Sequence, residues 1–206
     1  MPGTARNDPP ATAPSALRAR LGARSIVLVG MPGSGKSSIG RRLAQHLGLE
    51  FVDADQEIEV AAGMSIADIF SQHGEPYFRA GEARVIARLL DKGPQVIAAG
   101  GGAFVNPATR ALVRARALSV WLKADVDLLL RRVKRKNDRP LLRVADPGAV
   151  LKRLLTEREA VYAEADITVT SLDVPHEAVV EALVKALAQN LSEEGAKATT
   201  PVGARP

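Results

Sequence analysis

The fold of this protein is decided by residues 25–37, which read SIVLVGMPGSGKS. Residues 25–30 are a short apolar run rich in β-branched residues, which predicts a strand buried on both faces of a parallel sheet. Residues 30–37 fit the pattern G-x-x-x-x-G-K-[ST], and residues 36–47 are predicted to form a helix. A strand, a glycine-rich loop and a helix in this order predict a nucleotide-binding loop.

The residue types in this loop suit a triphosphate. Glycines let the backbone approach the phosphates, and successive backbone N–H groups at a helix N-terminus bind an anion. Lys36 is expected to place its charge on the β- and γ-phosphates, and the Ser37 hydroxyl is expected to bind Mg²⁺. The nucleotide-binding residues predicted here are Gly33, Ser34, Gly35, Lys36, Ser37 and Ser38. The alternative is a glycine-rich turn with an incidental lysine.

Strand and helix patterns alternate along the rest of the chain. Further strands are predicted at residues 50–53, 95–99, 118–122 and 167–170. Helices are predicted between them, at residues 36–47, 66–73, 82–90, 107–114, 125–134, 149–163 and 175–191. This alternation predicts a three-layer α/β fold with a five-stranded parallel sheet flanked by helices. Ligands bind at the carboxyl ends of the strands in such folds.

The ends of the chain differ from this pattern in composition. Residues 1–24 are rich in Pro, Ala and Arg, and residues 190–206 are a second segment of low complexity. We therefore expect residues 1–24 and 190–206 to be disordered and residues 25–189 to form one domain. Residues 1–24 lack the apolar run of a secretory signal. They are rich in Arg and poor in acidic residues, so an organellar transit peptide is the alternative, although the prolines oppose an amphipathic helix there. The predicted location is the cytoplasm.

Composition excludes several classes of function. The sequence has no cysteine, which excludes disulfides, thiolate metal sites and a cysteine nucleophile. Its three histidines are scattered, so a histidine-built metal site is not expected. No apolar run reaches the roughly 18–20 residues of a membrane span. Aromatic residues make up only 3% of the chain, which argues against stacking on nucleic-acid bases.

The positive charge is local. Lys and Arg number 28 and Asp and Glu 23, a net charge of +5, and much of the excess lies in residues 1–24. Residues 131–143 contain seven basic residues and a single acid, Asp138. This cluster predicts contact with an anionic ligand, or else a solvated helix end followed by a basic loop. Pro140 disfavours helix at Arg139, so residues of about 136–146 are predicted to be a phosphoryl-transfer lid carrying Arg139.

The second predicted strand ends in two carboxylates, Asp53 and Asp55. Alternation along a strand places both on the same side, near the phosphate loop if the two strands are neighbours. One can hold Mg²⁺ through water, and the other can bind an acceptor hydroxyl and take its proton. Helix capping by Asp55 is the alternative. The chain lacks the N-K-x-D motif of GTPases and any transporter ATPase signature, and it is too short for a motor, so a small-molecule kinase remains.

Three other features lie after predicted strands or on helices. Gly100, Gly101 and Gly102 follow the third strand and permit close backbone approach to an anion, although a plain turn is the alternative. Arg79 and Arg158, taken alone, read as helix-surface arginines.

Taken together, these motifs resemble the shikimate kinase family over residues 24–188. The resemblance rests, in order, on GMPGSGKSSIGRRLA, FVDADQEIE, GEPYFRAGE, VIAAGGG, RPLL and a late arginine before Val161 and Tyr162. It implies a fold like that of the P-loop nucleoside monophosphate kinases. It also implies ATP-dependent phosphorylation of the 3-hydroxyl of shikimate, in aromatic amino-acid biosynthesis, by an enzyme using ATP and Mg²⁺. We expect a monomer that binds neither nucleic acid nor a membrane.

The resemblance also implies a role for each matching residue. Asp55 would bind the acceptor hydroxyls, and Asp53 would support Mg²⁺ through water. Arg79 and Arg158 would hold the shikimate carboxylate, in a site lined by Gly101 and Gly102. The remaining positions would bind the nucleotide. Arg139 would contact the phosphates, and Arg132 and Pro175 would contact the adenine.

Two stretches depart from the family pattern. The late motif is usually R-x-P-L-Y, whereas residues 158–162 read REAVY, so the presentation of Arg158 is in question. Residues 170–175 differ in length from some relatives, which affects the assignment of Pro175. The rival hypotheses are a gluconate-type kinase, against which Arg79 and the three glycines argue, a non-catalytic nucleotide-binding regulator, and an RNA-binding protein.

Overall fold

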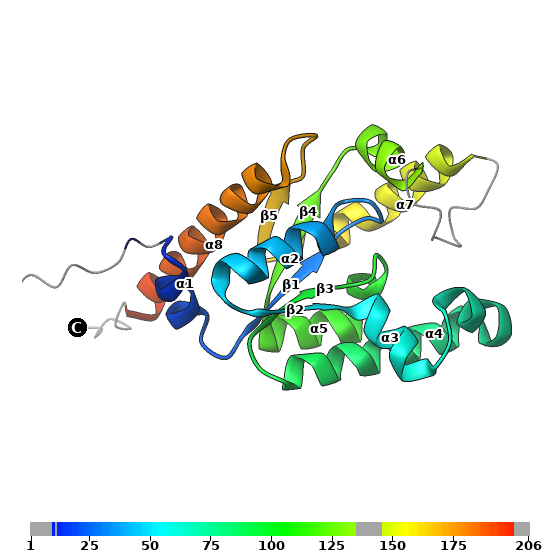
Figure 1. Ribbon diagram of the computed structural model, residues 1–206, viewed down its shortest axis with the longest axis horizontal. Helices are drawn as coiled ribbons and strands as arrows, with labels where there is room; N and C mark the ends of the chain where they lie inside the picture. Colours follow the sequence, from blue (N-terminus) through cyan, green and yellow to red (C-terminus); the bar gives the residue numbers. More distant parts are fainter. Residues whose placement is uncertain (1–9, 11, 135–145, 200–206) are drawn as a thin grey trace, which may run out of the picture.

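Helices flank a parallel sheet in the computed structural model, which describes residue 10, residues 12–134 and residues 146–199 (Figure 1). The strands are β1 (Ser25–Val29), β2 (Glu50–Asp53), β3 (Gln95–Ala98), β4 (Ala117–Lys123) and β5 (Ile167–Thr170). They form one five-stranded sheet in the order β2-β3-β1-β4-β5, and every pairing is parallel. The predicted α/β fold is therefore confirmed.

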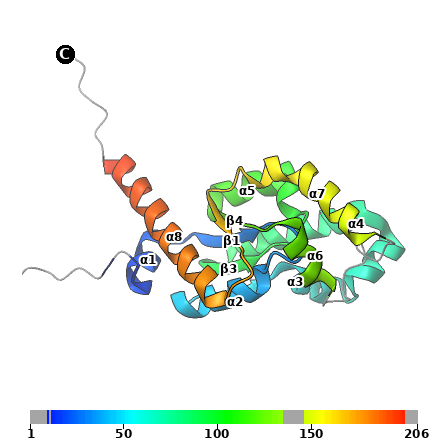
Figure 2. The ribbon, with the colours of Figure 1, turned by 90° about the horizontal axis from the view of Figure 1, so that it is seen from above.

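The helices cover both faces of the sheet. Their bounds are α1 (Pro14–Leu21), α2 (Lys36–Leu47), α3 (Ala54–Ala62), α4 (Ile66–Asp91), the short 3₁₀ turn η1 (Ala103–Val105), α5 (Pro107–Arg116), α6 (Val126–Lys134), α7 (Pro147–Tyr162) and α8 (His176–Thr199). Figure 2 shows α1, α2 and α8 on one side of the strands and α4, α5 and α7 on the other.

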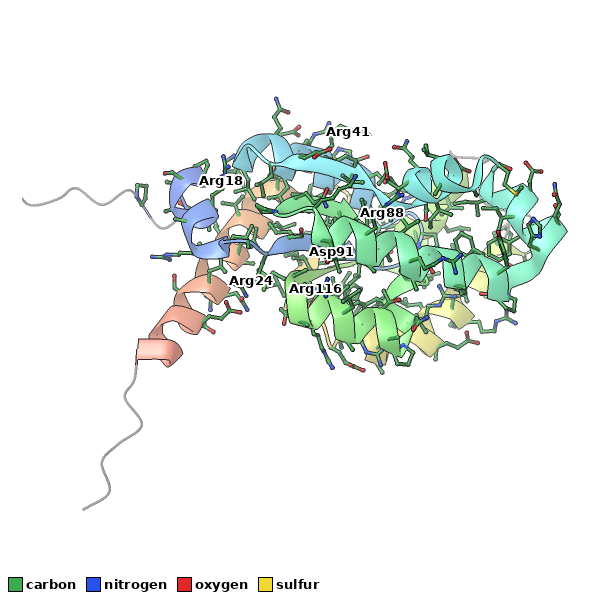
Figure 3. All side chains as sticks on the ribbon, turned by 90° about the horizontal axis from the view of Figure 1, so that it is seen from below. Arg18, Arg24, Arg41, Arg88, Asp91 and Arg116 are labelled. Atoms are coloured by element: carbon green, nitrogen blue, oxygen red, sulfur yellow. The ribbon has the colours of Figure 1, made fainter. Side chains whose placement is uncertain are left out.

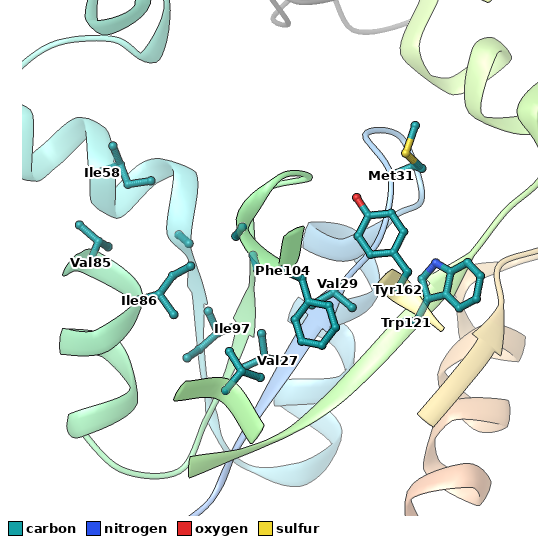
Figure 4. Packing of buried hydrophobic residues seen from close by; sticks show 14 of the residues in the cluster. Val27, Val29, Met31, Ile58, Val85, Ile86, Ile97, Phe104, Trp121 and Tyr162 are labelled. Carbon is teal, nitrogen blue, oxygen red and sulfur yellow. The ribbon is translucent and has the colours of Figure 1, made fainter. Parts of the chain in front are cut away.

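Alternation along β1 divides the core in two. Ile26 and Leu28 join the apolar cluster beneath α1, α2 and α8. Val27 and Val29 join the opposite cluster, in which α4, α5 and α7 pack (Figure 4). A strand buried on both faces is continuously apolar rather than alternating, which explains why residues 25–30 read as an uninterrupted apolar run.

The expectation of disorder at the two ends is wrong for part of each segment. Pro14 begins helix α1, where a proline is well tolerated, and Leu17 and Leu21 of this helix are buried. Helix α8 continues to Thr199, and its Glu194 accepts hydrogen bonds from Arg24 (Figure 3). Composition missed α1 and the extension of α8 beyond the predicted end at residue 191, because the apolar partners of these segments lie far away in the sequence.

The segment between β2 and β3 also differs from expectation. Helix α3, which was not predicted, follows β2 without a loop. The predicted helices at residues 66–73 and 82–90 are parts of α4, which is kinked at Gly74, where φ is 79° and ψ is 173°. Only glycine adopts this backbone without strain, so Gly74 allows the chain to turn and continue as a helix that reaches Asp91.

The strand order positions the functional loops. β3 lies between β2 and β1, so the carboxyl ends of these strands are neighbours. The phosphate loop follows β1, Asp53 ends β2, and Gly100–Gly102 come just after β3. The chain leaves β1 toward α2 on one face and leaves β3 toward α5 on the other, which creates the crevice where ligands bind in such sheets.

Candidate active site

The phosphate loop has the backbone that its glycines permit. Gly33 and Gly35 have positive φ angles of 85° and 99°, and Gly35 caps the N-terminus of α2. A Cβ atom on Gly33 would lie 2.9 Å from Val133 Cγ2, so this glycine is also required for close packing against α6. A glycine-rich turn with an incidental lysine would not account for the burial of Lys36, which follows Gly35.

Lys36 points back into the loop. Its side-chain ammonium donates hydrogen bonds to the carbonyl oxygens of Gly30, at 2.9 Å, and Met31, at 3.0 Å. The residue is only 7% exposed. A lysine held there brings a positive charge to the concave side of a helix N-terminus, where phosphate oxygens are favoured.

Ser37, in the first turn of α2, meets Asp53, the last residue of β2. The Ser37 hydroxyl donates a hydrogen bond of 2.6 Å to Asp53 Oδ2. Asp53 Oδ1 accepts a hydrogen bond of 3.1 Å from the backbone N–H of Asp55 and so caps α3. Capping, which we considered for Asp55, is therefore done by Asp53. A hydroxyl and a carboxylate at this distance are oxygen donors of the kind that Mg²⁺ prefers.

The acceptor side is built around Gly100. A Cβ atom on this residue would lie 2.6 Å from Glu82 Oε1 and 2.8 Å from Asp55 Oδ1, so two carboxylates approach the same glycine. Glu82 is 2% exposed, and its Oε1 has no hydrogen-bond partner among the residues that the structure describes. Burial raises the pKa of Glu82, the positive charge of Arg79 opposes this rise, and Asp55 adds to it.

Arg79 is held by carboxylates on its own helix. Its guanidinium donates to Glu82 Oε2 at 2.8 Å and to Glu75 Oε1 at 3.0 and 3.2 Å, and lies 5.0 Å from the centre of the Phe78 ring. Burial disfavours its charge, but the two glutamates outweigh this and raise the pKa of Arg79. A Cβ atom on Gly102 would lie 2.6 Å from Arg79 Nη1, which places the guanidinium against the glycine segment.

Arg158 reaches the same segment from α7. Its Nη1 donates a hydrogen bond of 3.0 Å to the carbonyl oxygen of Gly101, which also accepts one from the Tyr162 hydroxyl. Tyr162 is fully buried, and burial raises its pKa. Arg158 is thus presented to the site although the usual proline of the late motif is absent. Gly101 in turn packs on Pro32, because a Cβ atom added to Gly101 would lie 3.0 Å from Pro32 Cδ.

On the nucleotide side, Arg132 joins α6 to the segment after β5. It donates hydrogen bonds to Ser171 Oγ at 2.9 Å and to the Leu172 carbonyl oxygen at 2.8 Å. Both Arg132 and Ser171 lie beside Gly35 of the phosphate loop. Pro175 is exposed at the start of α8. Arg139 and most of the predicted lid lie outside the described residues.

Two residues of this site were missed by reasoning from the sequence. Glu82 carried a usable signal, because it follows Arg79 by three residues and so shares its helix face. Tyr162 carried none, since its hydroxyl meets Gly101 from a distant part of the chain.

This geometry can now be compared with known proteins. A family model described as shikimate kinase matches residues 32–188. A shikimate kinase of Bradyrhizobium diazoefficiens is 62% identical over 176 residues, which cover 85% of each chain. The chain belongs to the shikimate kinase family.

Solved structures of this family have the same architecture. A shikimate kinase from Acinetobacter baumannii in complex with shikimate matches with a TM-score of 0.80 at 35% identity, over 84% of this chain and 98% of that one. A shikimate kinase from Aquifex aeolicus matches with a TM-score of 0.71 at 34% identity, over 81% and 97%. A gluconokinase from Sinorhizobium meliloti reaches a TM-score of 0.57 at 21% identity, over 86% and 98%, and shares the fold alone.

The described residues hold no sign of two other classes of site. In that part of the chain, no three or more His, Asp or Glu side chains gather as a metal-binding group. None of the helices there is both long enough and apolar enough to span a membrane.

Proposed function

We propose that this protein transfers the γ-phosphoryl group of ATP to the 3-hydroxyl of shikimate. Membership of the shikimate kinase family supports this reaction. The observation that carries it is the meeting of Arg79, Arg158 and Asp55 at Gly100–Gly102, beside the phosphate loop. Shikimate has one carboxylate and three hydroxyls, and forked guanidinium groups and a carboxylate suit these groups respectively.

The phosphate loop is proposed to neutralise the triphosphate. Backbone N–H groups of Gly33–Ser38 and the ammonium of Lys36 would bind the phosphate oxygens, leaving the γ-phosphorus open to attack from the acceptor side. Arg132 would contact the adenine, and the exposed Pro175 would border the same pocket. The predicted contact of Arg139 with the phosphates stays a prediction.

The acceptor is proposed to be oriented by three side chains. Arg79 and Arg158 would bind its carboxylate, and Asp55 would accept the hydrogen of the 3-hydroxyl. The hydroxyl oxygen then forms a bond to the γ-phosphorus, the bond from this phosphorus to the β–γ bridging oxygen breaks, and ADP leaves. The hydroxyl proton passes to Asp55. Most of the rate enhancement comes from positioning and electrostatics.

The pair formed by Ser37 and Asp53 fits Mg²⁺ bound with a nucleotide. The hydroxyl and carboxylate supply oxygen donors, and the remaining coordination positions suit phosphate oxygens and water. When bound there, Mg²⁺ would neutralise charge on the β- and γ-phosphates. Asp53 would act through water while still capping α3.

ADP release by the purified protein with Mg²⁺-ATP tests the reaction directly. Shikimate, gluconate, quinate and no acceptor should be compared. Release that depends on shikimate is the expected result. Release only with gluconate would favour the rival kinase, and nucleotide binding without release on any acceptor would favour the regulator.

The remaining expectations are part of this proposal. We propose that residues 25–189 act as the catalytic domain and that the enzyme works as a monomer in the cytoplasm, with a small molecule rather than nucleic acid as its partner. Sedimentation at several concentrations, with and without RNA, tests the last two points.

A further inference from the structure

Helices α3 and α4 line a cavity of about 270 Å³ that is half open to solvent. The residues that line it are Ile58, Ala61, Ala62, Ile69, Tyr77, Phe78, Gly81, Arg84, Val85 and Arg88. Figure 4 shows Ile58 on α3 and Val85 on α4, which form part of its apolar wall. The cavity approaches the size of small-ligand pockets, which begin at about 300 Å³.

This cavity is distinct from the acceptor site. Tyr77, Gly81, Arg84 and Arg88 follow one another at intervals of three or four residues and share one face of α4. Arg79 and Glu82, which approach the glycine segment after β3, are each two residues from a member of that stripe. A rotation of about 200° separates residues two apart in a helix, so Arg79 points away from Tyr77 and Gly81. Phe78, whose ring centre lies 5.0 Å from the Arg79 guanidinium, forms the wall between the cavity and the acceptor site.

Small residues keep the cavity open. Gly81 lies inside α4, where glycine costs about 1 kcal/mol relative to alanine. Neither of the usual reasons for a glycine applies, because its φ is not positive and a Cβ atom there would meet nothing closer than Arg84 Nη2, at 4.0 Å. A larger side chain at Gly81 would therefore enter the cavity without a clash.

The mouth of the cavity has an excess of positive charge. Arg88 is paired with Glu57 at 3.0 Å. Arg84 makes no hydrogen bond or ion pair with any residue that the structure describes, and its guanidinium lies near Gly81. Figure 3 shows Arg88 on the same helix. An apolar cavity with the exposed guanidinium of Arg84 at its edge favours a ligand with an apolar body and one negative charge.

We propose that this cavity is a second ligand site, specific for a small carboxylate carrying one apolar ring. The ring would fill the space beside Gly81, between Ile58 and Val85, and the carboxylate would bind Arg84. The volume and the single charge select against nucleotides and other polyanions. The two opposed faces of α4 would then hold different ligands, the acceptor on the side of Arg79 and the apolar carboxylate on the side of Arg84.

Calorimetric titration of the full chain with benzoate tests the proposal. Shikimate binding is measured first, so that a failure of the proposed function is distinguished from a failure of this second site. Saturating shikimate is then kept present, so that benzoate cannot bind in the acceptor site. We expect a dissociation constant of about 1 mM or below for a ligand this small. Benzyl alcohol, which lacks the charge, and acetate, which lacks the ring, should each bind at least about fivefold more weakly.

Three variants locate the binding. Gly81→Leu fills the cavity and should abolish the benzoate signal, while Arg84→Gln should weaken binding about threefold to tenfold. Ala80→Leu adds the same side chain at an exposed neighbouring position and should bind as the wild type does. Thermal unfolding checks that each variant is folded, and Gly81→Ala, a smaller change, serves if the leucine variant is not.

Several results would overturn the proposal. These are the absence of binding at about 10 mM benzoate, equal binding by Gly81→Leu and the wild type, and loss of the signal whenever shikimate is present. Concentration-dependent dimerisation that Gly81→Leu abolishes would also overturn it, because a second copy of the chain would then occupy the cavity.

Discussion

Replacement of Gly102 by alanine should damage the acceptor site while sparing the fold. The backbone of Gly102 has φ −106° and ψ −11°, which alanine also adopts. The added Cβ atom would lie 2.6 Å from Arg79 Nη1 and 2.7 Å from Arg79 Cζ. Ordinary contacts begin at 3.4 Å, so the guanidinium must retreat by about 0.8 Å.

This displacement is large compared with the tolerance of a charged hydrogen bond. Bonds between guanidinium and carboxylate groups have lengths of about 2.7–2.9 Å and defined angles, and each contributes about 1.5–3 kcal/mol. Loss of one such bond to shikimate corresponds to a rise in KM of roughly 10- to 100-fold. The KM for ATP should change by less than about twofold, because no nucleotide-binding residue contacts the new methyl group.

Steady-state kinetics with each substrate varied in turn measure both constants. Gly195→Ala is a matched control, since a Cβ atom there meets no atom of the described part of the chain within 4 Å. A shikimate KM within twofold of wild type, in a variant with unchanged thermal unfolding, would refute the reasoning. An equal rise in both KM values would also refute it, because the damage would then extend to the phosphate loop.

Three further outcomes are expected. Asp55→Asn should abolish turnover without weakening ATP binding, measured by ADP release and nucleotide titration; loss of both would refute the assigned role. Glu82→Gln should change how stability depends on pH: the pKa of Glu82 is raised above 4.5 in the folded protein, so the wild type loses stability as pH rises from about 4.5 through the raised value. The variant should lack this loss, so the melting temperatures of the two proteins should diverge as the pH is raised. Melting temperatures that change with pH in parallel would contradict the prediction. Leu21→Ala should lower the free energy of unfolding by ~2 kcal/mol with kcat unchanged, and an unaltered melting temperature would mean that α1 contributes little.

The phosphate loop could be predicted because its requirements are local. Gly33, Gly35 and Lys36 are selected by the backbone and the charge within one turn between a strand and a helix, so their spacing in the sequence carries the information. The parallel sheet was equally readable, since strands covered on both faces are uniformly apolar.

The acceptor site was harder to predict from the residues alone. Arg79 and Arg158 are ordinary helical arginines until α4 and α7 bring them to Gly101 and Gly102, and only the family resemblance assigned them a role. The role of Glu82 depends on tertiary packing in the same way. Its burial and its raised pKa arise only when Gly100 packs against its carboxylate.

The two ends of the chain illustrate the same limit. A segment rich in proline and alanine has too little apolar surface to order itself, and composition therefore indicated disorder at residues 1–24. Leu17 and Leu21 are buried nonetheless, because α2 and α8 supply the surface against which they pack.

The sequence by itself determined the phosphate loop and the alternation of strands and helices, since each depends on residues adjacent in the chain. Only the tertiary structure decided that Asp53 rather than Asp55 caps α3, that Tyr162 and Arg158 share the Gly101 carbonyl, and that a cavity lies behind the acceptor-binding helix. These features arise from contacts between segments far apart in the sequence. The energies of such contacts cannot be inferred from a local sequence pattern.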